Sequence, residues 1–149
     1  IIFEMDCDFS HDPHDLVRLR VPCAEGGAGV TVGSRYVKGG GVVNWPFIRR
    51  FMSKGASIYV NLVLWLGVKD STAGFVAYRR EVLESIELDN VQFVGYAFQI
   101  EMKFRAKTKG YNIVEVPISF CDRVLGTSKM SLDIFNEAFL GVLKMRFQK

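Results

Sequence analysis

The sequence predicts a single α/β domain, or part of one, in which short strands alternate with helices. Apolar, β-branched segments bounded by turn residues alternate with segments of helical period along the 149 residues. The hydrophobic share of 49% is enough for one core and argues against disorder. An acidic doublet, Asp6 and Asp8, follows the first apolar run, and α/β folds place ligand chemistry where a strand ends.

The predicted strands are short apolar runs that are rich in β-branched residues. They cover residues 1–5, 29–33, 74–78 and 113–120. The last of them contains Pro117, which cannot donate to a ladder and therefore indicates a position at or near a sheet edge. The glycines of 39–41 predict a flexible loop. They lack the preceding strand and following helix of a dinucleotide-binding loop, so the motif assigns them no phosphate-binding role.

The predicted helices cover residues 14–20, 46–66, 80–86, 97–108 and 131–147. Asp12 and Pro13 are typical of a helix start, with Asp12 as the cap and Pro13 in the first helical position. Asn44 is expected to cap the second helix, which Gly55 weakens near its middle. The last helix has apolar residues on one side, as an amphipathic helix requires.

Charge is distributed unevenly along the chain. Residues 1–34 carry two basic and six acidic side chains, residues 35–80 carry eight and one, and residues 81–149 carry nine of each. A basic middle segment suits nucleic acid, a phosphorylated ligand or an anionic membrane surface, and composition does not choose among them. The three cysteines form no Cys-x-x-Cys pair, which argues against a disulfide framework or structural zinc and favours a reducing, cytosolic setting.

The uncharged segment 55–68 follows directly after the basic residues Arg49, Arg50 and Lys54. It is shorter than the roughly 20 apolar residues that a membrane-spanning helix needs. Two interpretations remain open. The segment is either an ordinary core helix or a helix in the membrane interface, with its basic residues at the headgroups.

Asp6 and Asp8 are the first candidate site. Two carboxylates at a strand end suit a divalent cation and the phosphates that it neutralises, whereas an Asx-rich turn is the alternative. A transition-metal site that adds His11 and His14 is less well supported, because His14 falls in the predicted helix and His11 in the turn before it.

Arg49 and Ser53 are the second candidate site. They are four residues apart, so on a helix they share one face and can reach one anionic group. Arg35 lies at a predicted strand end and can meet them. Ordinary solvated arginines are the alternative.

A series of motifs follows in a fixed order along nearly the whole chain. They are residues 5–13 (MDCDFSHDP), 33–36 with 39–42, 44–46 with 49–50, 53–56, Asp70, Thr72, 74–75 with 78–79, 95–102 (GYAFQIEM), 115–120 (EVPISF), 122–123, Gly126 and 128–129. These strings resemble the motifs of polyprenyl-phosphate mannose synthases, also called dolichol-phosphate mannose synthases, in glycosyltransferase family 2. The family's first nucleotide-binding strands have no counterpart here, so an N-terminal portion is expected to be absent from this chain.

The resemblance implies a GT-A-like sheet flanked by helices, of which residues 1–149 form the C-terminal portion, with interfacial helices at about 44–66. It implies that Asp6 and Asp8 hold Mg²⁺ or Mn²⁺ against the donor diphosphate, with the Cys7 backbone alongside. Cys7 stands where Ala is usual in the family. Ser10 stands where some relatives have a further metal ligand, Gln.

The same resemblance assigns the remaining site residues. The acceptor phosphate is expected to bind Arg35, Arg49 and Ser53, whereas the donor diphosphate is expected to face Arg123 and Lys129. Asp70 either orients the sugar, shapes its loop or caps the following turn. Gln99 and Glu101 either face the cleft or are structural.

The implied activity is metal-dependent, inverting transfer of mannose from GDP-mannose to a polyprenyl monophosphate by a peripheral enzyme at the cytoplasmic face of a membrane. A phosphate monoester is largely anionic at neutral pH, because its second pKa is about 6, so no strong base is needed. The alternatives are a glucosyl analogue that uses UDP-glucose and a non-catalytic, membrane-binding module. Nucleic acid is not an expected partner, because no reading motif is interleaved with the basic residues. A membrane-anchoring partner and the activity of this piece alone stay open.

Overall fold

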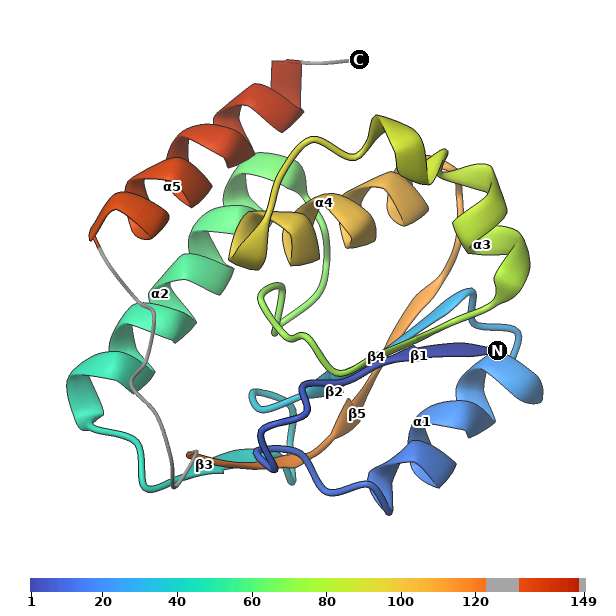
Figure 1. Ribbon diagram of the computed structural model, residues 1–149, viewed down its shortest axis with the longest axis horizontal. Coiled ribbons are helices and arrows are strands. Elements are labelled where there is room, and N and C mark those ends of the chain that lie inside the picture. The colour runs from blue at the N-terminus through green and yellow to red at the C-terminus, as the bar shows by residue number, and fades with distance from the viewer. Residues whose placement is uncertain (123–131, 148–149) are drawn as a thin grey trace.

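The computed structural model describes residues 1–122 and 132–147, and Figure 1 shows their arrangement. In this part of the chain a four-stranded sheet has the spatial order β1 (Ile2–Glu4), β4 (Val76–Tyr78), β2 (Val30–Ser34) and β5 (Ile113–Pro117). Strand β4 is antiparallel to both β1 and β2, whereas β2 and β5 are parallel. A second, parallel pair joins β3 (Gly41–Val43) to β6 (Ser119–Cys121).

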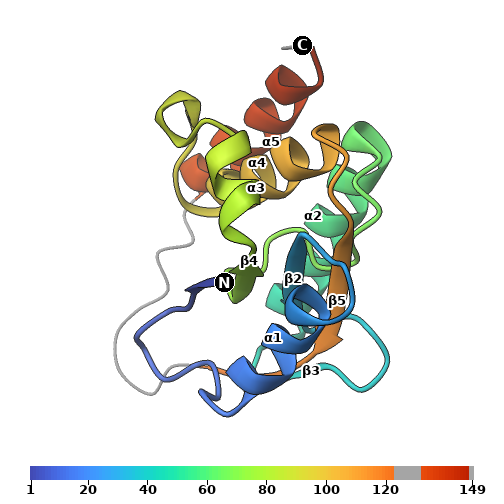
Figure 2. The ribbon, with the colours of Figure 1, turned by 90° about the vertical axis from the view of Figure 1, so that its right-hand side faces the viewer.

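Helices pack on both faces of the central sheet. They are α1 (Asp15–Ala24), α2 (Phe47–Leu64), α3 (Arg80–Ser85), α4 (Gly95–Thr108) and α5 (Leu132–Phe147), with a short 3-10 turn at Leu88–Asn90. Figure 2 shows the sheet between α1 and the group of α3, α4 and α5. The strands alternate accordingly: Phe75 and Ala77 face the core under α1, whereas Val76 and Tyr78 face the larger core under α2, α4 and α5.

The predicted strand over 113–120 is in fact two strands in different sheets. Pro117 has no N–H to donate, so the ladder of β5 with β2 ends there. The buried Ile118 then redirects the chain, because its N–H donates to the Ser34 carbonyl and its own carbonyl accepts from the Gly41 N–H. The edge position of β5 in the described sheet agrees with the prediction. The same contacts make Gly41 the first residue of β3, rather than part of a flexible loop.

The first helix begins later and ends later than the prediction. Asp12 precedes it in a turn, where its carboxylate accepts from the His14 N–H at 2.9 Å and its carbonyl accepts from the Asp15 N–H at 3.0 Å. The helix continues through Pro22 to Ala24, although proline removes one hydrogen bond from a helix interior. Burial of Cys23 in the core under α1 explains why the helix continues past Pro22.

The expected cap of the second helix is wrong. Asn44 has a φ of 61°, and the residue before the first helical position is Pro46. The other end of α2 is held by Asn61, whose side chain donates to the carbonyls of Ser57 and Val68 and accepts from the N–H groups of Gly67 and Val68. The helix thus spans one continuous stretch within the predicted range 46–66. The later helices α3, α4 and α5 lie within two residues of their predicted bounds.

No helix in the described ranges, 1–122 and 132–147, combines the length and the apolar character needed to cross a membrane.

The turn that leads from Arg35 to β3 depends on glycine at position 40. A Cβ on Gly40 would lie 2.4 Å from the Ser34 carbonyl oxygen, whereas a Cβ on Gly41 would meet nothing within 4 Å. We therefore expect Gly40→Ala to lower the free energy of unfolding by about 1–3 kcal/mol, since the backbone at Ser34 must move. Gly41→Ala is the matched control and should change it by less than about 0.5 kcal/mol. Urea denaturation measures both, and equal stabilities would contradict the close approach.

Candidate active site

The site begins with a buried ion pair at the carboxyl end of β2. The Arg35 guanidinium donates from Nε to Asp70 Oδ2 at 2.7 Å and from Nη2 to Asp70 Oδ1 at 2.6 Å. The Arg35 backbone N–H adds a third bond to Oδ2 at 2.9 Å. Burial alone lowers the pKa of Arg35, but the hydrogen bonds and charge of Asp70 outweigh it and raise that pKa above its ordinary value. The bidentate geometry fixes the orientation of the guanidinium.

One edge of this guanidinium stays available for a hydrogen bond to a ligand. Nη2 also donates to Thr72 Oγ1 at 3.1 Å, so the Nε and Nη2 donors are all used. Nη1 has no hydrogen-bond partner among the described residues and is not enclosed. Nη1 is therefore the donor that Arg35 can offer to an anionic ligand.

The loop that carries Asp70 is itself held from two sides. The Glu115 carboxylate, on β5, accepts from the backbone N–H groups of Lys69 at 2.9 Å and of Asp70 at 3.0 Å. The fully buried Lys103, on α4, donates from Nζ to the Ala73 carbonyl at 2.7 Å. Asp70 is completely buried and both its oxygens are bound by Arg35, so the structure favours its loop-shaping role over direct contact with a sugar.

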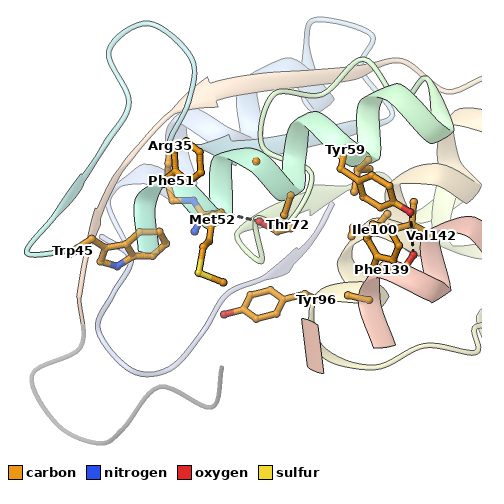
Figure 3. A pocket seen from close by; sticks show the side chains of 15 residues that line it. Arg35, Trp45, Phe51, Met52, Tyr59, Thr72, Tyr96, Ile100, Phe139 and Val142 are labelled. Atoms are coloured by element: carbon orange, nitrogen blue, oxygen red, sulfur yellow. Dashed lines mark hydrogen bonds between the residues drawn. The ribbon is translucent and has the colours of Figure 1, made fainter. Parts of the chain in front are cut away.

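Arg35 lies at one end of a cavity of about 370 Å³ between α2, α4 and α5 (Figure 3). Its polar lining includes Arg35, Ser53, Thr72 and Tyr96. The rest is mainly apolar: Trp45, Phe51, Met52, Gly55, Ala56, Tyr59, Val60, Ile100, Ala138, Phe139 and Val142. Among the described lining residues Arg35 is the only charged one, and none is acidic. A cavity of this composition suits an anionic group attached to an apolar chain.

The structure brings Arg35 and Ser53 to this cavity, whereas Arg49 is not among its described lining residues. Arg49 Nη1 donates to both carboxylate oxygens of Asp122 at 2.9 Å, and its guanidinium lies 4.2 Å from the centre of the Trp45 ring. The Arg35 guanidinium lies 5.2 Å from the same ring. Both guanidinium groups thus lie near the Trp45 ring.

The acidic doublet lies in the loop after β1. The Asp6 side chain is 64% exposed, with Oδ2 at 3.7 Å from His11 Nε2. Asp8 is half-buried, and its Oδ1 accepts from the Ser10 N–H at 3.1 Å and from Ser10 Oγ at 2.5 Å. Cys7, between them, is exposed, and its thiol is free. Asp8 is therefore oriented by its own turn, while Asp6 faces solvent.

A layer of aromatic rings connects the doublet with the arginine cavity. The buried His11 packs against Phe120 with the ring centres 5.1 Å apart, and Phe120 packs against Trp45 at 5.3 Å. The Arg35 guanidinium is 5.6 Å from the Phe120 ring. The two predicted clusters therefore share neighbouring rings rather than lying on unrelated parts of the molecule.

Comparison with known proteins identifies the family. Residues 1–87 match the family described as glycosyl transferase family 2. The chain belongs to glycosyl transferase family 2. With the layered α/β structure, this membership confirms the predicted GT-A-like fold class and the resemblance drawn from the motifs.

Three relatives in this family extend the similarity along the chain. A polyprenol monophosphomannose synthase of Mycolicibacterium smegmatis is 49% identical over 142 residues, which are 95% of this chain and 53% of the relative. An undecaprenyl-phosphate mannosyltransferase of Micrococcus luteus is 45% identical, and the matched region covers 97% of this chain and 58% of the relative. A dolichol-phosphate mannosyltransferase of Pyrococcus furiosus is 40% identical, and the matched region covers 85% of this chain and 35% of the relative. The chain thus spans about half the length of the first two.

The donors in the doublet fit the divalent cation that the family resemblance implies. Asp6 and Asp8 supply carboxylate oxygens, which Mg²⁺ and Mn²⁺ prefer. No group of three or more His, Cys, Asp or Glu residues in the described ranges could hold a metal by itself. That agrees with Mg²⁺, which is usually held by one or two carboxylates together with substrate phosphates. The transition-metal alternative gains no support, because the exposed His14 instead contacts Asp12.

Two of the expected residues of this family 2 site, Arg123 and Lys129, lie outside the described residues. The side chains of Gln99 and Glu101, whose roles were open, make hydrogen bonds within the fold. Glu101 is buried and binds Arg105 together with the N–H groups of Gln92 and Phe93, and the Gln99 amide donates to Glu4. Burial raises the pKa of Glu4 despite that hydrogen bond.

Sequence reasoning missed Trp45, Asp122 and Lys103 as parts of this site. The signal for Lys103 was present, because a lysine stands among the apolar residues of a helix. Trp45 and Asp122 belong to motifs of the family resemblance, but their contacts join distant segments.

Lys103 predicts an alkaline change in stability. Burial lowers its pKa to about 8, although the charges of Asp70 and Glu4 act in the opposite direction and Arg35 adds to the lowering. Above that pH the unfolded chain binds more protons at this lysine than the folded chain. The free energy of unfolding should therefore rise between about pH 8 and pH 10, by roughly 1 kcal/mol per pH unit at most.

Denaturation at several pH values checks this expectation. Lys103→Met should remove the rise, whereas Lys109→Met, at an exposed lysine just after α4, should keep it. The same pH dependence in both variants would contradict the assignment to Lys103.

Proposed function

We propose that the complete protein transfers mannose from GDP-mannose to a polyprenyl monophosphate, with inversion at the anomeric carbon, at the cytoplasmic face of a membrane. The observation that carries the proposal is the cavity, whose lining combines the fixed guanidinium edge of Arg35 and the hydroxyl of Ser53 with mainly apolar residues. A phosphate on a polyprenyl chain has this same division into an anionic head and an apolar tail. The names of the three relatives, all mannose synthases or mannosyltransferases of polyprenyl-type phosphates, support the same acceptor.

The acceptor needs little chemical activation. Its phosphate is largely anionic at neutral pH, since the second pKa of a monoester is about 6, and its oxygen is already a nucleophile. Arg35 Nη1 and the Ser53 hydroxyl would hold it at the end of the cavity. Catalysis would then rest on positioning and on stabilising the departing diphosphate. Arg49 would reach the phosphate by exchanging its hydrogen bonds to Asp122 for hydrogen bonds to the phosphate.

The donor side would rely on the acidic doublet. Asp6 and Asp8 would hold Mg²⁺ or Mn²⁺, which when bound neutralises negative charge on the nucleoside diphosphate as it departs. The Cys7 backbone would lie alongside, and Arg123 and Lys129 would face the same diphosphate. The Ser10 hydrogen bonds keep Asp8 in one orientation before the donor arrives.

The surface of α2 supports a peripheral position on a membrane. Its exposed large apolar side chains are Phe47, Ile48, Phe51, Ile58 and Leu62, and Trp65 follows at its end. The exposed Arg50 and Lys54 belong to the same helix, which has no acidic residue in its sequence. Apolar and basic side chains on one helix are typical of binding to an anionic lipid surface.

Assays of the complete protein with two donors and with lipid vesicles test the function. We expect transfer from GDP-mannose to a short-chain polyprenyl phosphate, and none from UDP-glucose. Transfer from UDP-glucose alone would favour the glucosyl analogue. Binding to anionic vesicles without any transfer would favour a non-catalytic membrane module and contradict the proposal.

Replacement of Asp8 tests the donor side separately. Asp8→Asn in the complete protein should lower kcat at least about 100-fold, because a neutral amide is a poor ligand for a hard cation. Asp12→Asn, in the exposed turn four residues later, is the matched control and should leave kcat within about twofold. The melting temperature of each variant should stay near that of the wild type. Unchanged turnover in Asp8→Asn would refute the metal assignment.

A further inference from the structure

The cavity contains more hydroxyl donors than the residues so far assigned to the acceptor phosphate. A phosphate monoester dianion carries three terminal oxygens, which accept several hydrogen bonds at once. Arg35 offers only Nη1, and Arg49 is bound to Asp122 outside the lining. The polar lining of the described cavity includes two further hydroxyl groups, on Thr72 and Tyr96, with no assigned role.

The hydroxyl of Thr72 is a donor already aimed away from Arg35. Its oxygen accepts from Arg35 Nη2 at 3.1 Å, so its own proton must be directed elsewhere. No acceptor for that proton occurs among the described residues. Figure 3 shows Thr72 joined to Arg35 by this hydrogen bond at the cavity.

The Thr72 backbone is fixed on both sides. Ser71 Oγ lies 3.3 Å from Ser57 Oγ on α2, and the Ala73 carbonyl accepts from Lys103 Nζ at 2.7 Å. A donor held in this way loses little conformational freedom when a ligand binds, which favours affinity.

Tyr96 stands across the cavity, in the first turn of α4. Figure 3 shows its ring on the side opposite Arg35 and Thr72, with the hydroxyl end directed toward the side of Met52 and Trp45. The side chain is 38% exposed and makes no hydrogen bond to a described residue. Its hydroxyl is therefore free to donate to a ligand in the cavity.

We propose that the hydroxyls of Thr72 and Tyr96 are further ligands of the acceptor phosphate, which complete the set begun by Arg35 Nη1 and Ser53. The ligand class is a phosphate monoester on an apolar chain, because the polar residues that line the cavity are hydrogen-bond donors and the rest of its lining is mainly apolar. This inference rests on the proposed function for the identity of the acceptor. It concerns binding of the phosphate, so it can be tested without transfer.

The test compares farnesyl phosphate with farnesol, which share a chain and differ in the phosphate. Calorimetry on the complete protein should show that Thr72→Val and Tyr96→Phe each raise the Kd of farnesyl phosphate at least about 10-fold, the usual loss for a hydrogen bond to a charged group. Farnesol binding should not change. Thr72→Ser keeps the hydroxyl and should stay within about twofold of the wild type. The matched controls, Thr108→Val and Tyr111→Phe, remove hydroxyls that bond carbonyls away from the cavity and should have no effect.

Three outcomes would overturn the inference. They are an unchanged Kd of farnesyl phosphate in the two test variants, an equal loss of farnesol binding, and a wild type that does not prefer the phosphate. The Tyr96 variant matters most, because that residue makes no bond to Arg35 and so cannot act by displacing it. A wild type that binds farnesyl phosphate through these hydroxyls but transfers no sugar would refute the proposed function and leave the inference standing.

Discussion

The buried pair of Arg35 and Asp70 is the interaction on which the rest of the site depends. A charge of either sign is costly in a protein interior, and removal of one partner leaves the other uncompensated. Here Asp70 binds Nε, Nη2 and the backbone N–H of Arg35, so that the guanidinium has one fixed orientation. Only Nη1 remains for a ligand among its donors, and its direction is set before any ligand arrives.

This pair also joins elements that would otherwise meet only through apolar packing. Arg35 follows β2, and Asp70 belongs to the loop before β4. The same loop receives Glu115 from β5 and Lys103 from α4. Four segments thus converge on one end of the cavity, whereas its mainly apolar sides come from α2, α4 and α5. The separation of a polar end from an apolar wall follows from this arrangement, and it is the physical basis for proposing a lipid phosphate as the acceptor.

The proposed donor and acceptor sides share a set of neighbouring aromatic rings. His11, Phe120 and Trp45 lie in sequence from the acidic doublet to the arginines. The Arg35 guanidinium is bound by Asp70 rather than by Asp6 or Asp8. In the proposed reaction, Asp6 and Asp8 would therefore serve one phosphate group through the cation, and the guanidinium edge of Arg35 would serve another. Asp122 binds the guanidinium of Arg49, as Asp70 binds that of Arg35.

Local sequence determined the family, the α/β class and most elements. Strands, helices and motifs depend on residues that are near one another in the chain, so periodicity and motif order are enough to find them. Tertiary structure alone decided how the functional residues are paired. Arg35 and Asp70 are 35 positions apart, and Arg49 and Asp122 are 73 apart, so no spacing rule connects them. It also split the strand at Ile118, extended α1 past Pro22 and placed Pro46, instead of the expected cap Asn44, directly before α2. In these places burial and contacts with distant segments outweigh the local preference of the residues.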